Sequence, residues 1–463
     1  MSKHFVRTGA FAILLATITA CNSGSDDNSS SPSGGDSGGN SGEENGGETD
    51  GDSGGDSVGG SSSEIITALI DGYTPPDPAT ASPVLLYTDI VAGPSGSLVT
   101  VWGQNLPGTP NLSCGSETCN IVSGIVADSD HVAHGNIPQR QKLVVEFNSG
   151  SGISLAGANT LPFSITNGSI INIDSGSSID LSSAMDGDVV YVAQGTYGNS
   201  SASCGGSNPI VCARSGVAVV GHPLNSNRPI IDCSSNVGVD IGGGSDISAS
   251  TLANFEFNCG DSGRAIRASR QGLKEAVLVV NNYVHNARSN NSGAFGEFSN
   301  TVDVFVVGNR TDTTGVPGEN NAHAIYHGGR GTNINFHISL NRLTNHQGGR
   351  AIQVYGHRSP ESMEQLYIIG NHLTNVNGNA AILVSHTDGQ SGTPDDRSWI
   401  DSVTVASNSC DDNQIQFRGA NLNGGDDWLA DSNNCPLNST MGGDANSWVI
   451  VTNNDGTVSG NTR

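Results

Sequence analysis

The chain has 463 residues, enough for roughly two or three domains, and it combines a modest apolar content of 35% with 63 glycines. This composition favours turn-rich β structure over helical bundles. The formal net charge of −25 argues against nucleic acid as a general partner, because a phosphate backbone attracts basic surfaces.

The first residues have the pattern of a secretory signal. Lys3 and Arg7 precede the apolar run "GAFAILLATITA", which ends at Cys21. The sequence "ITAC" resembles the lipobox of bacterial lipoproteins. The resemblance implies a signal peptide over residues 1–21 and a lipid on the thiol of Cys21. Asn22 in place of Asp implies the outer membrane of a bacterial envelope, with the chain facing the cell surface or the periplasm. The alternative is a plain signal peptide with an incidental cysteine.

Residues 22–63 are predicted to be a disordered tether. They are mostly Gly, Ser, Asp, Asn and Glu, with nine acidic residues and neither Lys nor Arg. Such a segment has too few apolar side chains to form a core.

Residues 64–168 alternate short β-rich runs with Gly and Pro turns, which predicts a small all-β domain. The strand "VTVWGQNL" and the closing stretch "LPFSITNG" resemble an immunoglobulin-like domain of the IPT type. Such modules often precede the catalytic domains of surface polysaccharide enzymes.

Residues 169–463 are predicted to be a right-handed parallel β-helix. The stretches "DGDVVYVAQGTY" and "SGVAVVGHPLNSNRPIIDC" resemble the entry and first turn of pectate-lyase-like β-helices. A repeat supports the same fold, because apolar strands end in asparagine at intervals of 24 to 37 residues. Stacked amides can bond the turns above and below, so we predict a ladder of Asn258, Asn282, Asn309, Asn341, Asn371 and Asn408.

A second repeated strand defines the candidate site. Ile266, Ile325, Ile352 and Ile382 align as an interior column. Because side chains alternate across a strand, an outer face is predicted to carry Arg267, Tyr326, Gln353 and Tyr355, followed on the next rungs by His357, Arg358 and His386.

This region is also cationic. Residues 264–358 hold ten of the 19 Lys and Arg residues but five acids. The excess suggests an anionic ligand, since a guanidinium binds two oxygens of a carboxylate or sulfate. The alternative is that the arginines pair with neighbouring acids.

The β-helix resemblance implies a polysaccharide lyase that cleaves a uronate polymer by β-elimination. That reaction needs a group to neutralise the carboxylate, a base for the C5 proton and an acid for the leaving oxygen. The catalytic candidates are Tyr326, His323, His327 and His357. The substrate-binding candidates are Arg267, Arg330, Arg350, Gln353, Tyr355, Arg358 and His386. For His323 and His327 a buried position is an equal alternative, because residues two apart in a strand point to the same face and both lie two residues from the interior Ile325.

Two other functions stay open, a glycoside hydrolase and a non-catalytic glycan-binding surface protein. A hydrolase needs two carboxylates about 5–9.5 Å apart, and the predicted face offers none on its strands. The nearby acids are in loops, at Asp388, Asp395, Asp396, Asp426 and Asp427. The last four could bind calcium; the cofactor is otherwise open. Lys274 either serves a Lys/Arg mechanism or pairs with Glu275 at the surface.

Eight cysteines remain after Cys21, and secretion permits disulfides. Proximity in the chain suggests four local pairs, although eight cysteines allow many connectivities. The predicted pairs are Cys114–Cys119, Cys204–Cys212, Cys233–Cys259 and Cys410–Cys435.

Overall fold

The computed structural model describes most of the chain after Gly60. The described residues are 61–70, 81–134, 137–198, 204, 208–234, 237–260, 264–268, 271–288, 292–328, 331–356, 362–386, 399–400, 402–411, 413–420, 427–435, 437–442 and 448–452. The predicted signal peptide, Cys21 and nearly all of the tether lie outside them. Among the described residues, no helix is long and apolar enough to cross a membrane.

A short helix, α1 (Ser62–Ile70), begins the described part. The Ser61 N–H donates to Glu64 Oε2 (2.7 Å), and the Glu64 N–H donates to Ser61 Oγ (3.2 Å). This reciprocal pair is a capping box, and it fixes where the helix begins. Ile66 and Ile70 are buried. This helix was not predicted from the sequence, although the Ser-x-x-Glu pattern of Ser61 and Glu64 signals it.

Two small sheets follow and form a β-sandwich. Antiparallel pairing dominates, and Phe147 of one sheet packs on Phe163 of the other with ring centroids 4.1 Å apart. The likeness to an immunoglobulin-like module stays a prediction. The first sheet contains β1 (Val84–Thr88), β3 (Ser97–Gln104), β6 (Asn120–Ile121), β7 (Val126–Ala127) and β8 (Gln141–Phe147). The second contains β2 (Ala92–Gly93), β4 (Leu112–Cys114), β5 (Glu117–Thr118), β9 (Ser151–Leu155) and β10 (Thr160–Ile165).

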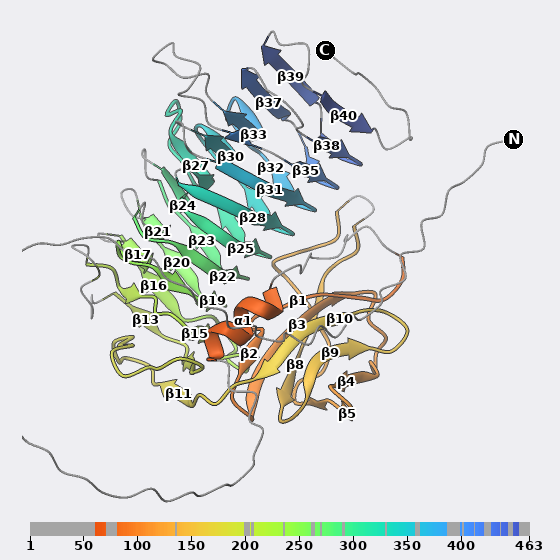
Figure 1. The fold of residues 1–463 in the computed structure, drawn as a ribbon, viewed down its shortest axis with the longest axis vertical. Coiled ribbons are helices and arrows are strands. Elements are labelled where there is room, and N and C mark those ends of the chain that lie inside the picture. The colour runs from red at the N-terminus through yellow and green to blue at the C-terminus, as the bar shows by residue number, and fades with distance from the viewer. Residues whose placement is uncertain are drawn as a thin grey trace, which may run out of the picture. The chain divides into compact units, whose positions relative to one another are not determined.

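The rest of the described chain is a right-handed parallel β-helix of three parallel sheets, as the sequence predicted (Figure 1). Sheet 1 contains β11 (Ile170–Ile173), β12 (Val189–Val192), β15 (Ala218–Gly221), β18 (Ile247–Ser248), β19 (Thr251–Ala253), β22 (Lys274–Val280), β25 (Thr301–Val307), β28 (Thr332–Ser339), β31 (Ser362–Ile369), β34 (Trp399–Ile400), β35 (Val403–Ala406), β38 (Asp427–Asp431) and β40 (Trp448–Thr452). Sheet 2 contains β13 (Thr196–Tyr197), β16 (Ile230–Asp232), β20 (Glu256–Asn258), β23 (Tyr283–His285), β26 (Arg310–Asp312), β29 (Arg342–Thr344), β32 (His372–Thr374) and β36 (Ser409–Cys410). Sheet 3 contains β14 (Val211–Cys212), β17 (Val237–Ile241), β21 (Arg264–Ala268), β24 (Ser292–Phe298), β27 (Ala322–His327), β30 (Arg350–Gly356), β33 (Ala380–His386), β37 (Ile415–Ala420) and β39 (Leu437–Gly442).

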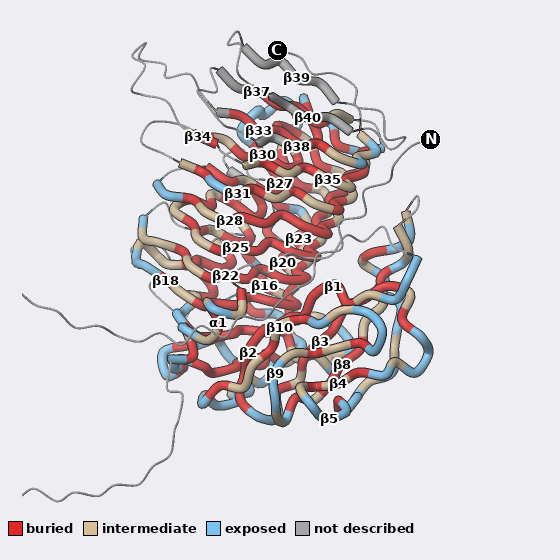
Figure 2. The backbone as a smooth tube through the Cα atoms, turned by 45° about the vertical axis from the view of Figure 1, so that its right-hand side comes forward, coloured by how far each residue is buried: buried red, intermediate tan, exposed pale blue. Residues whose placement is uncertain are grey.

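The predicted interior column of isoleucines is confirmed in sheet 3. Ile266, Ile325, Ile352 and Ile382 are fully buried and occupy one register position. The prediction missed one rung, because Phe295 of the glycine-rich strand β24 stands between Ile266 and Ile325. Figure 2 shows buried positions running through the stack of rungs.

The asparagine ladder lies at the corner between sheets 1 and 2. The Nδ2 of Asn309 donates to Asn341 Oδ1 (3.1 Å) and to the Val279 carbonyl (2.9 Å). The Asn309 N–H also donates to Asn341 Oδ1 (2.8 Å). The amides therefore satisfy backbone groups that the bend leaves without strand partners. The ladder residues are Asn282, Asn309, Asn341, Asn371, Asn408 and Asn433.

The ladder prediction was wrong at its first position. Asn258 is exposed at the end of β20, and the ladder position of that turn is Phe255, whose N–H donates to Asn282 Oδ1 (3.1 Å). The residue just before each ladder position adopts positive φ, for example 50° at Asn281 and 60° at Leu340. The ladder therefore follows this left-handed bend and not the end of an apolar strand.

All four predicted disulfides are formed: Cys114–Cys119, Cys204–Cys212, Cys233–Cys259 and Cys410–Cys435. Two of them join neighbouring rungs of the β-helix. Cys233 follows β16 and Cys259 follows β20, and these strands pair in sheet 2. Cys410 belongs to β36, and Cys435 lies one turn later. These two bonds therefore tie successive turns together.

The sandwich and α1 pack on the outer face of sheet 1. A single buried cluster joins Val101 and Phe163 of the sandwich to Tyr191, Val220 and Val280 of sheet 1. The Tyr191 hydroxyl donates to the Leu98 carbonyl (2.8 Å). The interior of the β-helix forms a separate core, so the turns of sheet 1 under the sandwich and α1, from β12 to β25, are buried on both faces.

Candidate functional site

The candidate site is the outer face of sheet 3. Tyr326 and Gln353 are register partners on adjacent rungs, and Tyr355 lies two residues beyond Gln353. Tyr326 and Tyr355 are partly exposed, whereas Gln353 is 8% exposed. Rungs of a parallel sheet are about 4.8 Å apart, which is close enough for one sugar chain to touch several of them.

His327 lies inside the β-helix. It is 0% exposed, its Nε2 is 3.1 Å from Thr301 Oγ1, and its ring edge packs on Phe336. Burial lowers the pKa of His327 to about 3. His327 is therefore a buried histidine, which was one of the two alternatives from the sequence. A ring in this position does not reach a polymer in solution, which argues against His327 as the catalytic base.

His323 is also enclosed, at 4% exposure. Its Nδ1 accepts a hydrogen bond from the Arg350 N–H (3.3 Å), and its ring centroid is 5.0 Å from that of Tyr326. Burial, then the charges of His346 and Arg350, lower its pKa to about 3. His323 is thus a neutral imidazole at pH 7 that supports the Tyr326 ring from behind.

Arg267 has a carboxylate partner. It forms an ion pair with Asp240, which lies on the rung below in β17 and is 0% exposed. Arg264 of the same strand is 4.0 Å from Glu297 in β24. Arg267 therefore pairs with a neighbouring acid, which was the alternative to an anionic ligand. The sequence analysis was also wrong that the strands of this face carry no carboxylate, since Asp240 and Glu297 lie in sheet 3.

Arg350 is partly exposed at the start of β30. Its Nη1 lies 3.5 Å from the Asn320 carbonyl oxygen, which is a long hydrogen bond. In register, Arg350 pairs with His323 on the strand of Tyr326, one rung away. Arg267 lies on β21, two rungs from the strand of Tyr326.

Lys274 is not a surface residue. It is 0% exposed, and its Nζ donates to the carbonyls of Gln271 and Gly272, both at 2.7 Å. Burial lowers its pKa to about 8, and the charges of Asp240 and Asp246 oppose that shift. The predicted surface pair with Glu275 is wrong, because the ammonium is enclosed near Asp240 and Arg267.

Several predicted site residues lie outside the described part of the chain. They are Arg330, His357, Arg358, the side chain of His386, and the loop acids Asp388, Asp395, Asp396 and Asp426, together with the side chain of Asp427. The predicted calcium site falls on the same loops.

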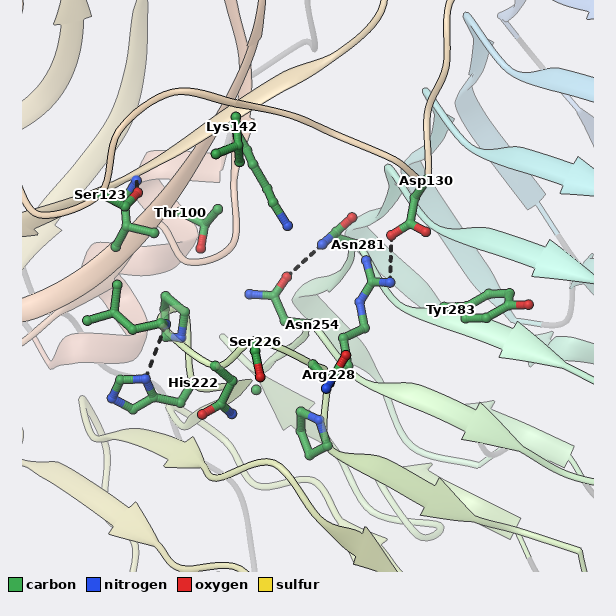
Figure 3. Close-up of a pocket in the computed structure, with 18 of the residues that line it drawn as sticks. Thr100, Ser123, Asp130, Lys142, His222, Ser226, Arg228, Asn254, Asn281 and Tyr283 are labelled. Carbon is green, nitrogen blue, oxygen red and sulfur yellow. Dashed lines mark hydrogen bonds and ion pairs between the residues drawn. The ribbon is translucent and has the colours of Figure 1, made fainter.

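A cavity of about 590 Å³ lies between the sandwich and the β-helix turn that contains residues 221–229 (Figure 3). Lys142 extends into it, and Arg228 forms an ion pair of 2.6 Å with Asp130 on its wall. Tyr283, also in the lining, lies under the Arg310 guanidinium at 4.4 Å. The sequence analysis missed this cavity, because its walls are far apart in the chain and no local pattern marks them.

Comparisons with known proteins do not assign a family. No protein-family model matches the chain, and no curated protein sequence matches it. A solved structure, the family 28 exopolygalacturonase of Yersinia enterocolitica, has 10% identity and a TM-score of 0.30 over 80% of this chain and 98% of that chain.

Proposed function

We propose that the chain binds an acidic polysaccharide across the outer face of sheet 3 and cleaves it by β-elimination, with Tyr326 as the proton-transferring residue. One observation carries this proposal. Of the predicted catalytic residues that the structure describes, Tyr326 is partly exposed, whereas His323 and His327 are enclosed.

The neighbours of Tyr326 suit a uronate. The next rung carries both Arg350, a positive charge whose N–H bonds His323, and Gln353, an amide in register with Tyr326. These groups would hold the substrate carboxylate and stabilise the negative charge that develops when the C5 proton leaves. In this role the Tyr326 oxygen, as phenolate, would accept the C5 proton and then, as the phenol, donate it to the glycosidic oxygen as the C4–O bond breaks and a C4=C5 double bond forms.

The test is a panel of uronate polymers incubated with the full-length protein. A lyase produces the ultraviolet absorbance of the unsaturated C4=C5 product. Tyr326→Phe should lower the rate by about 10²–10⁴-fold. Tyr283→Phe is a matched control, because it removes a partly exposed hydroxyl from sheet 2. Unchanged turnover in Tyr326→Phe would contradict the assigned role.

Hydrolysis is a second candidate, with Asp240 and Glu297 as its two carboxylates; it requires the enclosed Asp240 to be released from its ion pair with Arg267. Their strands, β17 and β24, are two rungs apart, which is about 10 Å of backbone spacing. Inverting glycosidases place two carboxyl groups about 6.5–9.5 Å apart. New reducing ends without the unsaturated product, abolished in Glu297→Gln, would establish this candidate. Binding without either product would make the chain a glycan-binding surface protein.

We also propose that Cys21 carries a lipid that anchors the chain in a bacterial outer membrane. The support is the lipobox-like "ITAC" after a signal-like apolar run. Cys21→Ser should remove fatty-acid labelling and move the protein out of the membrane fraction. Continued labelling of the variant would contradict this anchor.

A further inference from the structure

A cluster of two histidines and an aspartate lies where the loop between β7 and β8 meets sheet 2. His134 belongs to this loop, His372 is the first residue of β32, and Asp411 follows β36. The ring centroids of His134 and His372 are 3.6 Å apart with an interplanar angle of 25°. His134 Nε2 is 3.3 Å from Asp411 Oδ1 and 2.7 Å from Ser409 Oγ.

Three potential ligand atoms converge in this cluster. One each from His134, His372 and Asp411 lies within 4.8 Å of the others. The Nε2 of His372 is buried and has no hydrogen-bond partner among the described residues. A buried nitrogen left in this state costs about 1–3 kcal/mol. A bound cation would remove that cost and give the three groups a common partner.

We propose that His134, His372 and Asp411 bind a divalent transition-metal ion of the zinc class. Two imidazole nitrogens and one carboxylate oxygen are ligands that Zn²⁺ prefers, whereas Ca²⁺ takes oxygen ligands. Zinc–nitrogen bonds of about 2.0–2.1 Å in a tetrahedral site place neighbouring ligand atoms about 3.3 Å apart. His134 Nε2 and Asp411 Oδ1 already have this separation.

The site is open to solvent on the side of Asp411. Asp411 is held next to the Cys410–Cys435 disulfide, and its side chain is 41% exposed. Solvent can thus reach the ion and supply a fourth ligand.

The three ligands come from segments far apart in the chain, so the ion would join the sandwich to the β-helix. The established contact is the hydrogen bond between His134 and Ser409. Coordination would add bonds across the same boundary and would stabilise the folded chain by an amount that rises with the logarithm of the free metal concentration once this exceeds Kd. This role is independent of any reaction on sheet 3.

The experiment is a titration of the full-length, EDTA-treated protein with ZnCl₂ by calorimetry and with CoCl₂ by visible absorption. We expect one ion per chain, a cobalt spectrum of a low-symmetry nitrogen and oxygen site, and a rise in Tm on metal addition. His134→Gln and His372→Gln should each weaken binding by at least about tenfold, since even the loss of an outer partner of a metal ligand has that effect. His285→Gln is the control, because this histidine lies in sheet 2 next to Glu256.

Two results would overturn the proposal: no stoichiometric binding by the wild-type protein, or unchanged binding in both ligand variants. If a glutamine variant fails to fold, Asp411→Asn gives the same comparison at the most exposed ligand. Loss of metal binding in Asp411→Asn supports the site, and retention of tight binding opposes it. A Tm rise that persists in the variants would place the stabilising ion elsewhere.

Discussion

The outer faces of sheet 1 and sheet 3 belong to the same solenoid but carry different side chains. One outward column of sheet 1 reads Tyr191, Val220, Ala253, Val280 and Val307 on successive rungs, and all five are buried under the sandwich or α1. The corresponding column of sheet 3 reads Asp240, Arg267, Gly296, Tyr326 and Gln353. The repeat of a solenoid thus fixes its backbone, whereas the outward side chains differ with what covers each face: they are mostly apolar under the sandwich and polar on sheet 3.

The face of sheet 1 changes where the sandwich contact ends. The column of Phe305 continues as His337 and Tyr367, whose rings stack at 4.3 and 4.4 Å. The strands keep their register through this change. A change of outer side chains along one sheet is therefore a sign of a change in partner, and the polar residues of sheet 3 are expected to have a polar ligand.

The largest effect on stability is expected where the repeat is strictest. Asn341→Ala should lower the free energy of unfolding by about 3–4 kcal/mol, because it removes the acceptor of the buried Asn309 N–H and the amide that donates to the Val306 carbonyl and to Asn371 Oδ1. The matched control is Asn258→Ala, at an exposed asparagine, with a change within about 0.5 kcal/mol. Equal losses in chemical denaturation would mean that the ladder has no special role.

The next effect tests the charged end of sheet 3. Asp240→Asn should cost about 2 kcal/mol, because it removes the negative charge that faces Arg267 and lies near the buried Lys274. Arg264→Gln breaks a pair at 4.0 Å between partly exposed groups and should cost less than about 0.5 kcal/mol. Thermal unfolding of both variants would show whether Asp240 is a structural or a functional acid. A fully stable Asp240→Asn protein with lost activity would favour the hydrolase candidate.

The enclosed histidine gives a smaller, pH-dependent effect. His327 has a folded pKa of about 3, below its unfolded value of about 6.5. The unfolded chain therefore binds a proton that the folded chain does not, and stability falls as the pH drops from about 6.5 towards 3. His327→Val copies Val354 of the next rung and should reduce that dependence by about 1 kcal/mol per pH unit. Urea unfolding at several pH values measures it, and an unchanged slope would place His327 outside the interior.

The smallest effect on stability is expected on the partly exposed side of the candidate site. Tyr355→Phe should change the free energy of unfolding by less than about 0.5 kcal/mol, yet weaken binding of an acidic polysaccharide by several-fold through the lost hydroxyl. Affinity electrophoresis in gels that contain the polymer can measure this. Normal binding together with reduced stability would show that Tyr355 serves the fold and not a ligand.

The periodic and local features could be predicted from the sequence. The isoleucine column and the four disulfides depend on repeat spacing or on short chain separation, and both signals are visible in one sequence. The prediction for Asn258 was wrong because its strand, like the others, is apolar and ends in asparagine. The hydrogen bond of the ladder in this turn instead follows the left-handed bend at Asn254, where φ is 64°. A backbone angle of this kind has no clear single-residue signature at that position.

The candidate site was less predictable, because its character depends on which atoms meet across rungs. The alternation of side chains along the strand placed Tyr326 on the outer face. It did not decide whether His323 and His327 are buried or exposed, because the backbone direction at a strand end is not fixed by the alternation. Arg267 and Asp240 are 27 residues apart, and His134 and Ser409 are 275 apart. Contacts at such separations follow from the complete fold, so the sequence offered the pairing of Arg267 as one alternative without naming Asp240, and it did not predict the His134 cluster.

The sandwich contacts the β-helix at three corners that follow one another along the stack. Asp89 bonds Asn254, the Tyr87 hydroxyl leaves no room for a Cβ at Gly308, and Arg140 donates to the Leu340 carbonyl (2.7 Å). These corners are whole rungs apart. The three contacts can therefore form together only if a fixed number of turns separates the corners. A turn duplicated or deleted between Asn254 and Leu340 would displace one contact by about 4.8 Å. Among the described residues, the last turn for which a sandwich hydrogen bond or ion pair is seen is that of Ser409 and Asp411, so we expect related chains to vary in length beyond it, at the C-terminal end of the solenoid.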